Sequence, residues 1–186
     1  MWCISRGTSR IVIAIPSRGI VIKCARVRRW PIKLLFKDVV VTGRMMLPSS
    51  SRKTKKLYLE FVGSAINRAF IQFFQGFTSN WREWAYYKRV NPRHRSFLQP
   101  TYFSLLGILN IQKFGEPVDT TRGEELYHRF FKVAGQALIH DGHHWTFARN
   151  FHLAPDGPKI LDYGSVATQK IIDEYGAALF ANSQSK

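Results

Sequence analysis

The sequence predicts an α+β fold, with a small antiparallel sheet near the N-terminus and helices in most of the remainder. Two β-branched runs, residues 11–15 (IVIAI) and 20–24 (IVIKC), flank a Pro-Ser-Arg-Gly turn, which predicts a hairpin. Residues 57–90 contain few helix breakers, and residues 122–139 and 165–181 carry apolar side chains at helical spacing. With 186 residues, the chain can form one domain, which we expect to have two lobes.

Between the first hairpin and the helices, the pattern is less regular. Residues 39–42 fit either another strand or the end of a helix that begins near Pro31. Residues 48–56 (PSSSRKTKK) are rich in serine and lysine, which predicts a mobile basic loop. In residues 57–90 we expect two helices, at about 58–75 and 79–88, with Ser79 as the N-cap of the second.

The second half of the chain alternates between strands and helices. Residues 102–106 and 107–112 read as two short strands around a turn. Residues 122–139 read as a helix after a loop, and residues 165–181 as the last helix. Between these helices, residues 150–164 (NFHLAPDGPKILDYG) predict a tight hairpin, because Pro-Asp-Gly suits a two-residue turn.

The net charge of +16 and the pI near 10.3 predict a surface that attracts nucleic acid, acidic membranes, nucleotides or acidic proteins. No stretch has the ~18 apolar residues of a membrane span. Cys3 and Cys24 lie in apolar, strand-like segments, and we expect buried thiols in a reducing, cytoplasmic compartment. Residues 1–37 lack acidic side chains, as in a transit peptide, but their strand-like alternation argues against that function.

The hairpin of residues 150–164 places two metal-binding side chains at its ends. Asn150 precedes the first strand and Asp162 follows the second, so we expect them to lie side by side at one edge of the hairpin. An amide and a carboxylate oxygen can share a divalent cation with a phosphate group. The sequence Asp162-Tyr163-Gly164 follows directly.

This pattern resembles the magnesium-binding part of the protein-kinase-like fold, in which an Asn, a β-hairpin and an Asp-Phe-Gly tripeptide follow each other. Lys23 on the second strand looks like the family's phosphate-binding lysine, and the turn with Gly7 and Ser9 resembles a reduced phosphate-covering loop. Glu83 looks like the helical glutamate that holds this lysine, and Glu60 is its rival.

The resemblance implies ATP and Mg²⁺ as ligands, with Asn150 and Asp162 holding the metal. It also implies that the backbone from Ile111 onward meets the adenine as a linker between lobes. The N-terminal lobe would span residues 1–115, including a helical insertion. Residues 116–186 would form a truncated C-terminal lobe of a minimal kinase, such as a phage or bacterial one.

Two departures from the family pattern leave the activity open. The family's catalytic base lies five residues before the metal-binding Asn, and Trp145 stands there. Asp141 could serve as the base if the intervening loop bulges, with Lys23 as the catalytic residue that holds the phosphates; otherwise the chain is a pseudokinase. Only about twenty residues follow Gly164, and the resemblance then implies a protein without the family's peptide-binding segment, so we expect either a small-molecule or a protein hydroxyl as acceptor.

Three further interpretations depend on other residues. The cluster His140, Asp141, His143 and His144 could ligate zinc, although adjacent histidines point apart in an extended chain. The basic side chains could bind nucleic acid or an acidic protein, with neighbouring aromatics stacking on bases. The chain could also be a basic component of a virion or a ribonucleoprotein. The candidate contacts are Arg26, Arg28, Arg29, the segment Arg52–Lys56, Arg89, Arg93, Arg95, Trp81, Trp84, Tyr86 and Tyr87.

Overall fold

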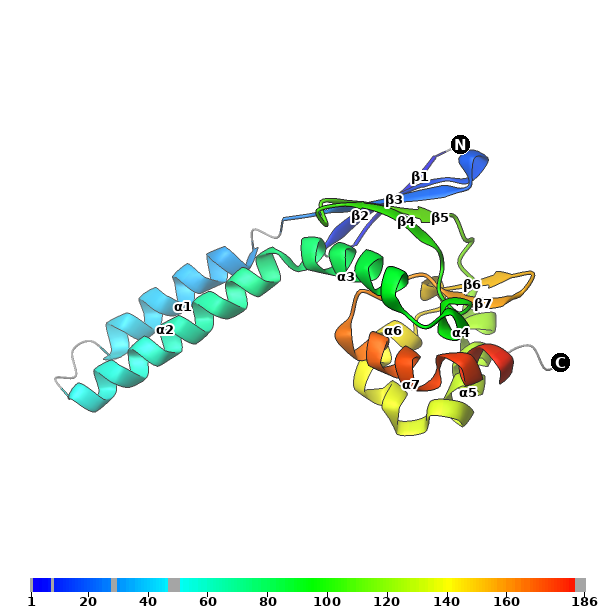
Figure 1. Cartoon of the computed structure of the whole chain (residues 1–186). Coiled ribbons are helices and arrows are strands. Elements are labelled where there is room, and N and C mark those ends of the chain that lie inside the picture. Colours follow the sequence, from blue (N-terminus) through cyan, green and yellow to red (C-terminus); the bar gives the residue numbers. More distant parts are fainter. Residues whose placement is uncertain (1, 8, 28–29, 47–50, 183–186) are drawn as a thin grey trace.

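An antiparallel sheet, a projecting pair of helices and a helical part with a short β-hairpin make up the computed structural model of the chain (Figure 1). It describes residues 2–7, 9–27, 30–46 and 51–182. The predicted α+β class is therefore confirmed.

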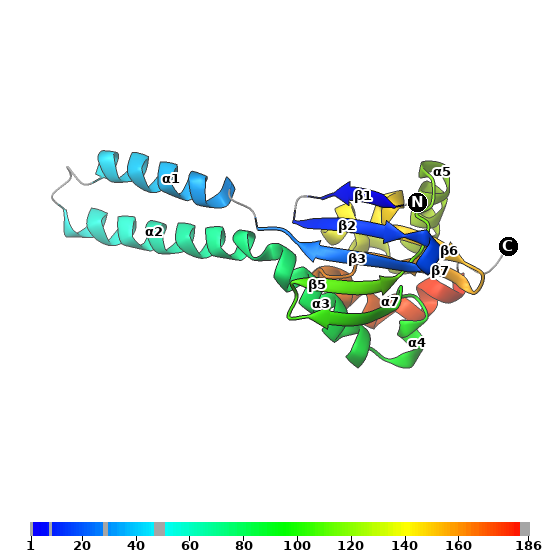
Figure 2. The same cartoon turned by 90° about the horizontal axis from the view of Figure 1, so that it is seen from above.

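The sheet has five strands in the order β1-β2-β3-β5-β4, and each neighbouring pair is antiparallel (Figure 2). The strands are β1 (Cys3–Arg6), β2 (Arg10–Ile15), β3 (Ile20–Ala25), β4 (Thr101–Leu105) and β5 (Leu109–Lys113). The first predicted hairpin is confirmed, with Ile15 paired to Ile20. Gly19 closes its turn at a φ of 63°, in the left-handed region that glycine adopts without strain.

Strand β1 lies at the edge of the sheet, and its four residues are exposed. The prediction of two buried thiols is therefore wrong for Cys3, because no element in the described part of the chain covers this edge strand. Cys24 in β3 is half-buried. Both are free thiols, and the reducing compartment stays a prediction.

Helices α1 (Trp30–Met46) and α2 (Arg52–Phe73) form an antiparallel pair that projects from the sheet (Figure 1). Residues 39–42 lie in α1 and are not a strand. The predicted loop is wrong for Arg52–Lys56, which form the start of α2, because arginine and lysine favour helix and α1 packs alongside. Residues 48–50 lie outside the described part of the chain. No described helix is long and apolar enough to cross a membrane.

Helix α3 (Gln75–Arg89) runs beneath the sheet and connects it to the helical part (Figure 1). Ser79 lies inside this helix, so its predicted role as an N-cap is wrong. The helix begins earlier because Gly76 fits against the sheet: a Cβ there would come within 2.2 Å of the main-chain oxygen of Ser9. A larger residue at position 76 would push α3 away from the turn between β1 and β2.

The helical part contains the second hairpin and most of the remaining helices. Its elements are α4 (Pro92–Arg95), α5 (Thr120–Ala134), α6 (Gly142–Trp145), β6 (Phe151–Ala154), β7 (Gly157–Ile160) and α7 (Val166–Asn182). The predicted hairpin of residues 150–164 is confirmed, with Ala154 opposite Gly157 across a two-residue turn. The helix predicted at 122–139 ends at Ala134, because Gly135 takes a φ of 50°; a 3-10 helix then continues to Asp141.

One hydrophobic core lies between α3, α5, α7 and the β6–β7 hairpin. Its largest buried side chains are Tyr86, Phe97, Leu98, Phe130, Leu138, Trp145, Phe151, Ile160, Tyr163, Ile172 and Leu179. Residues 86–98 therefore share a core with residues 126–179. This core crosses the boundary expected at residue 115, because the C-terminal half of α3 packs with the helical part and not only with the sheet.

Candidate functional site

Lys23 lies in the middle of β3, and its side chain is buried, at 5% exposure. Its Nζ donates to Oε2 of Glu83 at 3.0 Å and to the main-chain oxygen of Leu161 at 2.6 Å. The predicted pairing of Lys23 with Glu83 is therefore present. Glu60, the rival glutamate, is exposed on α2, far along the projecting helices. Lys23 thus links the sheet both to α3 and to the residue that precedes Asp162.

Glu83 is completely buried because α3 docks closely against β3 and β5. The buried side chain of Asn80 donates to the main-chain oxygens of Lys23 and Gly107, both at 3.0 Å. Asn110 in β5 donates in turn to the main-chain oxygen of Asn80 at 2.6 Å. These bonds fix the rotation of α3, so Glu83, three positions after Asn80, faces the same region as Lys23.

Arg10, at the start of β2, connects the two carboxylates of the site. Its Nη1 lies 2.5 Å from Oε1 of Glu83, and its Nη2 lies 2.5 Å from Oδ2 of Asp162. Val12 pairs with Lys23 in the sheet register, so Arg10, two positions earlier on the same face, projects toward the same region as Lys23. Arg10, Lys23, Glu83 and Asp162 are called the charge quartet below.

The charge quartet contains two cations and two anions, and it is largely shielded from water. Burial raises the pKa of Asp162, but the charges of Arg10 and Lys23 outweigh this and hold that pKa well below its usual range. Burial lowers the pKa of Lys23, and the charge of Glu83 opposes this shift. Burial also lowers the pKa of Arg10, but Asp162 and Glu83 raise it above its ordinary value. The quartet is therefore electrically balanced as it stands, and the loss of any single group leaves one charge without a counter-charge.

Asn150 and Asp162 lie at adjacent ends of the β6–β7 hairpin, as predicted, because Leu161 N donates to the main-chain oxygen of Asn150 at 2.7 Å. The side chain of Asn150 donates to the main-chain oxygen of His144 at 2.9 Å. Oδ1 of Asp162 is buried and has no hydrogen-bond partner among the described residues. The other oxygen is taken by Arg10.

A magnesium ion at Asp162 would sit beside the guanidinium of Arg10. A divalent cation next to this fixed positive charge is repelled, and Oδ2 of Asp162 is already paired with Arg10. Among the described residues, no group of three or more His, Cys, Asp or Glu side chains could hold a metal ion. With Arg10 in this position, the residues present do not fit the predicted magnesium site.

Tyr163 holds the segment after β7 in place through core packing and hydrogen bonds. Its buried ring belongs to the core, and its hydroxyl donates to the main-chain oxygen of Gln99 at 2.8 Å and lies 2.6 Å from Oγ1 of Thr101. Gly164 then passes close to α3, where a Cβ would come within 2.8 Å of the main-chain oxygen of Ser79. Asp162 is therefore positioned from both sides by packed residues.

Asp141, the predicted catalytic base, is buried at 3% exposure near the start of α7. Its carboxylate accepts a hydrogen bond from the hydroxyl of Thr168 and lies 2.8 Å from Nδ1 of His144. A carboxylate enclosed in this way does not offer an open oxygen to a substrate hydroxyl. The 3-10 helix that ends at Asp141 turns this side chain toward α7, and its role as a base stays a prediction.

His144 is a site residue that the sequence reasoning placed only in a zinc cluster. Burial lowers its pKa, but the hydrogen bond with Asp141 and the charge of Asp162 outweigh this and raise it. No metal-binding group that includes it occurs among the described residues, and the side chain of His143 lies outside the description. His144 thus pairs with buried Asp141 and lies within the electrostatic influence of Asp162.

We expect His144 to make folding stability depend on pH. Because its folded pKa lies above the unfolded value near 6.5, the protonated form stabilises the fold. This contribution is complete below about pH 6.5 and is lost as the pH rises through the raised pKa. The His144→Asn variant should lose this part of the pH dependence, measured as urea midpoints between about pH 6 and 8.

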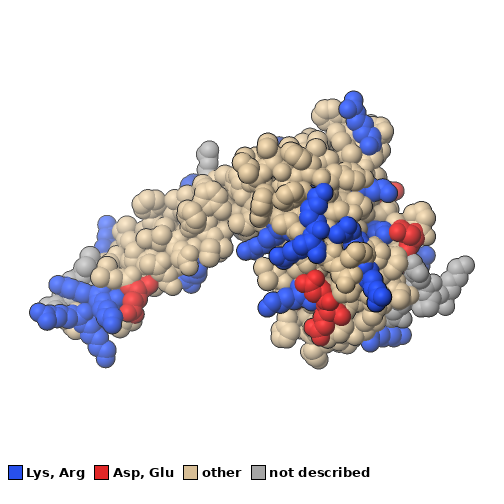
Figure 3. All heavy atoms as spheres, in the orientation of Figure 1, with Lys and Arg blue, Asp and Glu red and all other residues tan. Residues whose placement is uncertain are grey.

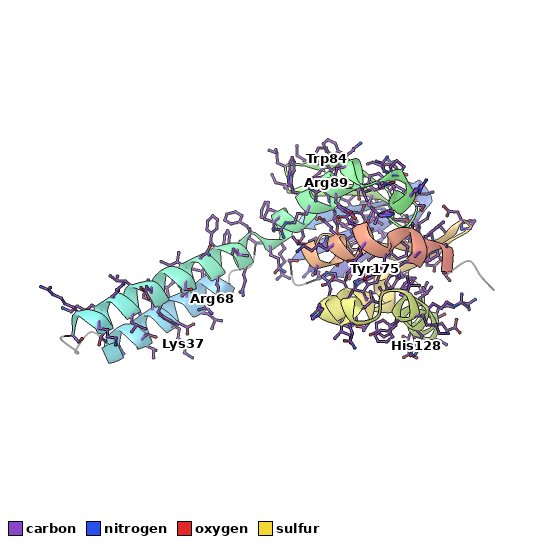
Figure 4. All side chains as sticks on the ribbon, turned by 60° about the horizontal axis from the view of Figure 1, so that its bottom comes forward. Lys37, Arg68, Trp84, Arg89, His128 and Tyr175 are labelled. Atoms are coloured by element: carbon purple, nitrogen blue, oxygen red, sulfur yellow. The ribbon has the colours of Figure 1, made fainter. Side chains whose placement is uncertain are left out.

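The matched control for this prediction is His128, which is exposed on α5 (Figure 4). His128→Asn should leave the pH profile unchanged. A wild-type midpoint that does not fall over this interval would contradict the prediction.

In the predicted phosphate-covering turn and adenine-binding linker, several backbone N–H and C=O groups already form hydrogen bonds within the protein. The N–H of Gly7 donates to the main-chain oxygen of Arg10 at 2.9 Å, and the carbonyl of Ser9 accepts from Arg26. Ile111 lies inside β5, between β3 and β4. The prediction of free linker N–H groups is wrong for the two residues that end this segment: Lys113 N donates to Pro100 O, and Phe114 N donates to Gly19 O.

The aromatic side chains proposed to stack on bases divide into two groups. Tyr86 is wrong as a candidate, because it is buried in the core and its hydroxyl donates to Asp173 at 2.7 Å. Trp81 is 45% exposed on α3, and its ring centroid lies 5.0 Å from that of Trp84. Figure 4 labels Trp84 and Arg89 on this helix, and Figure 3 shows basic side chains gathered over α3. Arg28 and Arg29 lie outside the described residues.

Comparison with protein-family models, with curated proteins and with solved structures found no match to this chain.

Proposed function

We propose that the chain has a protein-kinase-like fold and binds a nucleotide without transferring its phosphoryl group, with Arg10 in place of a metal ion at Asp162. The charge quartet is the observation that carries this proposal. It brings the lysine of β3, the glutamate of α3 and the aspartate after β7 together, which are the three charged groups that the resemblance implies. Arg10 adds a fourth group and neutralises the aspartate.

The order of elements supports the kinase-like part of the proposal. Helix α3 lies between β3 and β4 in the chain and presses Glu83 against Lys23 from beneath the sheet (Figures 1 and 2). The β6–β7 hairpin directly precedes Asp162-Tyr163-Gly164. The helices α1 and α2 account for the long gap between Lys23 and Glu83.

Two observations support the absence of phosphoryl transfer. Trp145, at the position where the family has its base, is fully buried in the core. Asp141, the alternative base, is enclosed by Thr168 and His144. A general base must come within hydrogen-bond reach of the proton that it removes. Neither side chain meets that condition.

We expect ATP to bind without magnesium, because its phosphates can replace Glu83 and Asp162 as partners of Lys23 and Arg10. ATP at about ten times its dissociation constant should add roughly 1.4 kcal/mol to the free energy of unfolding. For a chain of this size, this corresponds to a rise in melting temperature of about 3–6 °C. The rise should be the same in EDTA and in excess MgCl₂.

The Arg10→Met variant tests separately whether the quartet binds a nucleotide and whether Arg10 takes the place of a metal ion. Without the guanidinium, Asp162 is free to bind a cation, so the ATP-induced rise should disappear in EDTA and return with MgCl₂. Arg6→Met, on exposed β1, is the matched control and should behave like the wild type. A wild-type rise that requires magnesium would contradict the role of Arg10, and no rise under either condition would contradict nucleotide binding.

A second candidate function, phosphoryl transfer to a protein or small-molecule hydroxyl, is favoured by one observation. His144 is oriented by Asp141 at 2.8 Å, and its pKa responds to the charge of Asp162, so an imidazole could act as the base in place of a carboxylate. Incubation of the Arg10→Met variant with magnesium and ATP labelled at the γ-phosphate tests this function. Phosphate release that His144→Asn abolishes would favour transfer over binding alone.

A further inference from the structure

The projecting helices carry an apolar face that no other described element covers. In both helices, residues of this face directly follow residues that are half-buried or buried: Phe36 follows half-buried Leu35, and Ile66 follows buried Ala65. One position turns the side chain by about 100° around the helix. Because the helices are antiparallel, the same rotation about each axis leads to the same side of the pair. We call Ile32, Phe36, Val40, Leu59, Ile66 and Phe70 the apolar face.

The side chains of the apolar face are unusually open to water for their size. Phe36 is 67% exposed, Leu59 69% and Phe70 63%. Scattered exposed apolar residues are normal, but a contiguous set on one side of a projecting element indicates an interaction surface. The inner side of the pair is filled separately, with Tyr58 donating to the main-chain oxygen of Val39 at 3.1 Å.

Basic side chains lie beside the apolar face at two places on the projecting helices. Lys33 and Lys37 lie along the outer edge of α1, on the side away from α2 (Figure 4 labels Lys37). Basic residues also gather at the far end of the pair, where Figure 3 shows a group of Lys and Arg. The described, exposed basic residues at that end are Arg44, Arg52, Lys53, Lys55 and Lys56.

We propose that the α1–α2 pair docks flat on an anionic phospholipid surface, with the apolar face at the acyl boundary and the basic side chains among the headgroups. Apolar residues on one side with lysine and arginine at its margin are the combination that favours interfacial helices. Neither helix can cross a membrane, which agrees with a position in the plane of the interface.

Other binding partners would match either the basic or the apolar side chains of this surface, but not both. Nucleic acid would neutralise the basic side chains and leave Phe36, Leu59 and Phe70 in water. A second copy would cover these apolar side chains, but each chain carries a net charge of +16, and this charge repels another copy. Anionic lipid supplies both the negative charge and the apolar environment.

Co-sedimentation of the full chain with vesicles tests the proposal. We expect binding to vesicles of phosphatidylcholine mixed with phosphatidylglycerol, and little binding to phosphatidylcholine alone. The Ile66→Glu variant should bind the anionic vesicles about ten-fold or more weakly, because it places a charge at the acyl boundary. Replacing Lys53, Lys55 and Lys56 with glutamine should weaken binding by about five-fold for each lysine near the surface.

Ile71→Glu is the matched control. Ile71 lies on the same helix and is 59% exposed, compared with 50% for Ile66, but it points about 140° away from Ile66 and about 100° away from Phe70 around the helix axis. This variant should bind like the wild type. The proposal is overturned if the wild type does not bind anionic vesicles, or if both glutamate variants behave alike. Concentration-dependent dimers that Ile66→Glu alone abolishes, without vesicle binding, would assign the face to a second copy instead.

Discussion

Replacing Glu83 with glutamine should destabilise the fold by about 3–5 kcal/mol at neutral pH, as measured by urea unfolding. The carboxylate is completely buried and receives Arg10 at 2.5 Å and Lys23 at 3.0 Å. The neutral amide keeps the shape but leaves two buried cations with Asp162 as their remaining counter-charge in the quartet. A buried charge without its partner is the costly outcome, more than the loss of one hydrogen bond.

The loss of folding stability in the Glu83→Gln variant should become smaller as the pH rises. Burial already lowers the pKa of Lys23, and removing the Glu83 charge lowers it further, so Lys23 can become neutral in the folded variant. A lysine that binds its proton more tightly in the unfolded chain makes stability increase with pH until the unfolded pKa is reached. The difference between wild type and Glu83→Gln should therefore be smaller near pH 9 than near pH 7.

Two further variants make the Glu83 prediction specific. Glu60→Gln, on the exposed surface of α2, should change stability by less than about 0.5 kcal/mol. Adding Arg10→Met to Glu83→Gln removes one cation and one anion, so the double variant should recover part of the loss, with a coupling of about 1–3 kcal/mol. Additive losses at the two positions would show that the quartet does not act as a unit.

The first hairpin of the sheet could be predicted from the sequence because the residues that specify it are close together in the chain. Two β-branched runs and a turn with glycine specify both strands and their pairing, and Ile15 does pair with Ile20. The start of α2 could not be predicted, because the serine and lysine residues at 48–56 form a pattern typical of a loop. The packing of α1 against α2, which the sequence does not show, favours a helix there. The start of α3 depends on the fit of Gly76 against Ser9, which is a contact between distant segments.

The candidate site shows the same division between local and distant information. Lys23, Glu83 and Asp162 were identified by their order along the chain, whereas the role of Arg10 was missed, although a signal existed. The hairpin turn fixes the register, and this register places Arg10 on the same face of the sheet as Lys23. What the sequence could not show is that α3 and the segment after β7 bring two carboxylates to that face. The burial of Asp141 was missed for a similar reason, since it depends on the position of α7.

Replacing Trp145 with alanine should cost about 3–5 kcal/mol of folding stability, a loss comparable to that of Glu83→Gln. The ring is completely buried and stacks on Phe97, with centroids 6.1 Å apart and planes 10° apart. Phe130 meets it edge-on at 6.0 Å, and Phe151 lies 6.0 Å away on another side. Alanine would leave a cavity between these three rings. Phe97 follows α4, Phe130 lies in α5 and Phe151 lies in β6. Urea unfolding measures the loss, and Trp81→Ala, at a 45% exposed position, should cost far less.

Aspartate at position 145 distinguishes a lost catalytic base from a structural residue. If Trp145 stood at an open catalytic position, Trp145→Asp would restore phosphoryl transfer. We expect instead that it unfolds the protein, because an unpaired carboxylate would have to enter the cluster of aromatic rings. Trp145→Phe should be tolerated best, since Nε1 of Trp145 has no hydrogen-bond partner among the described residues and only volume is lost. A folded Trp145→Asp protein that hydrolyses ATP would contradict both the structural role of Trp145 and the proposed absence of transfer.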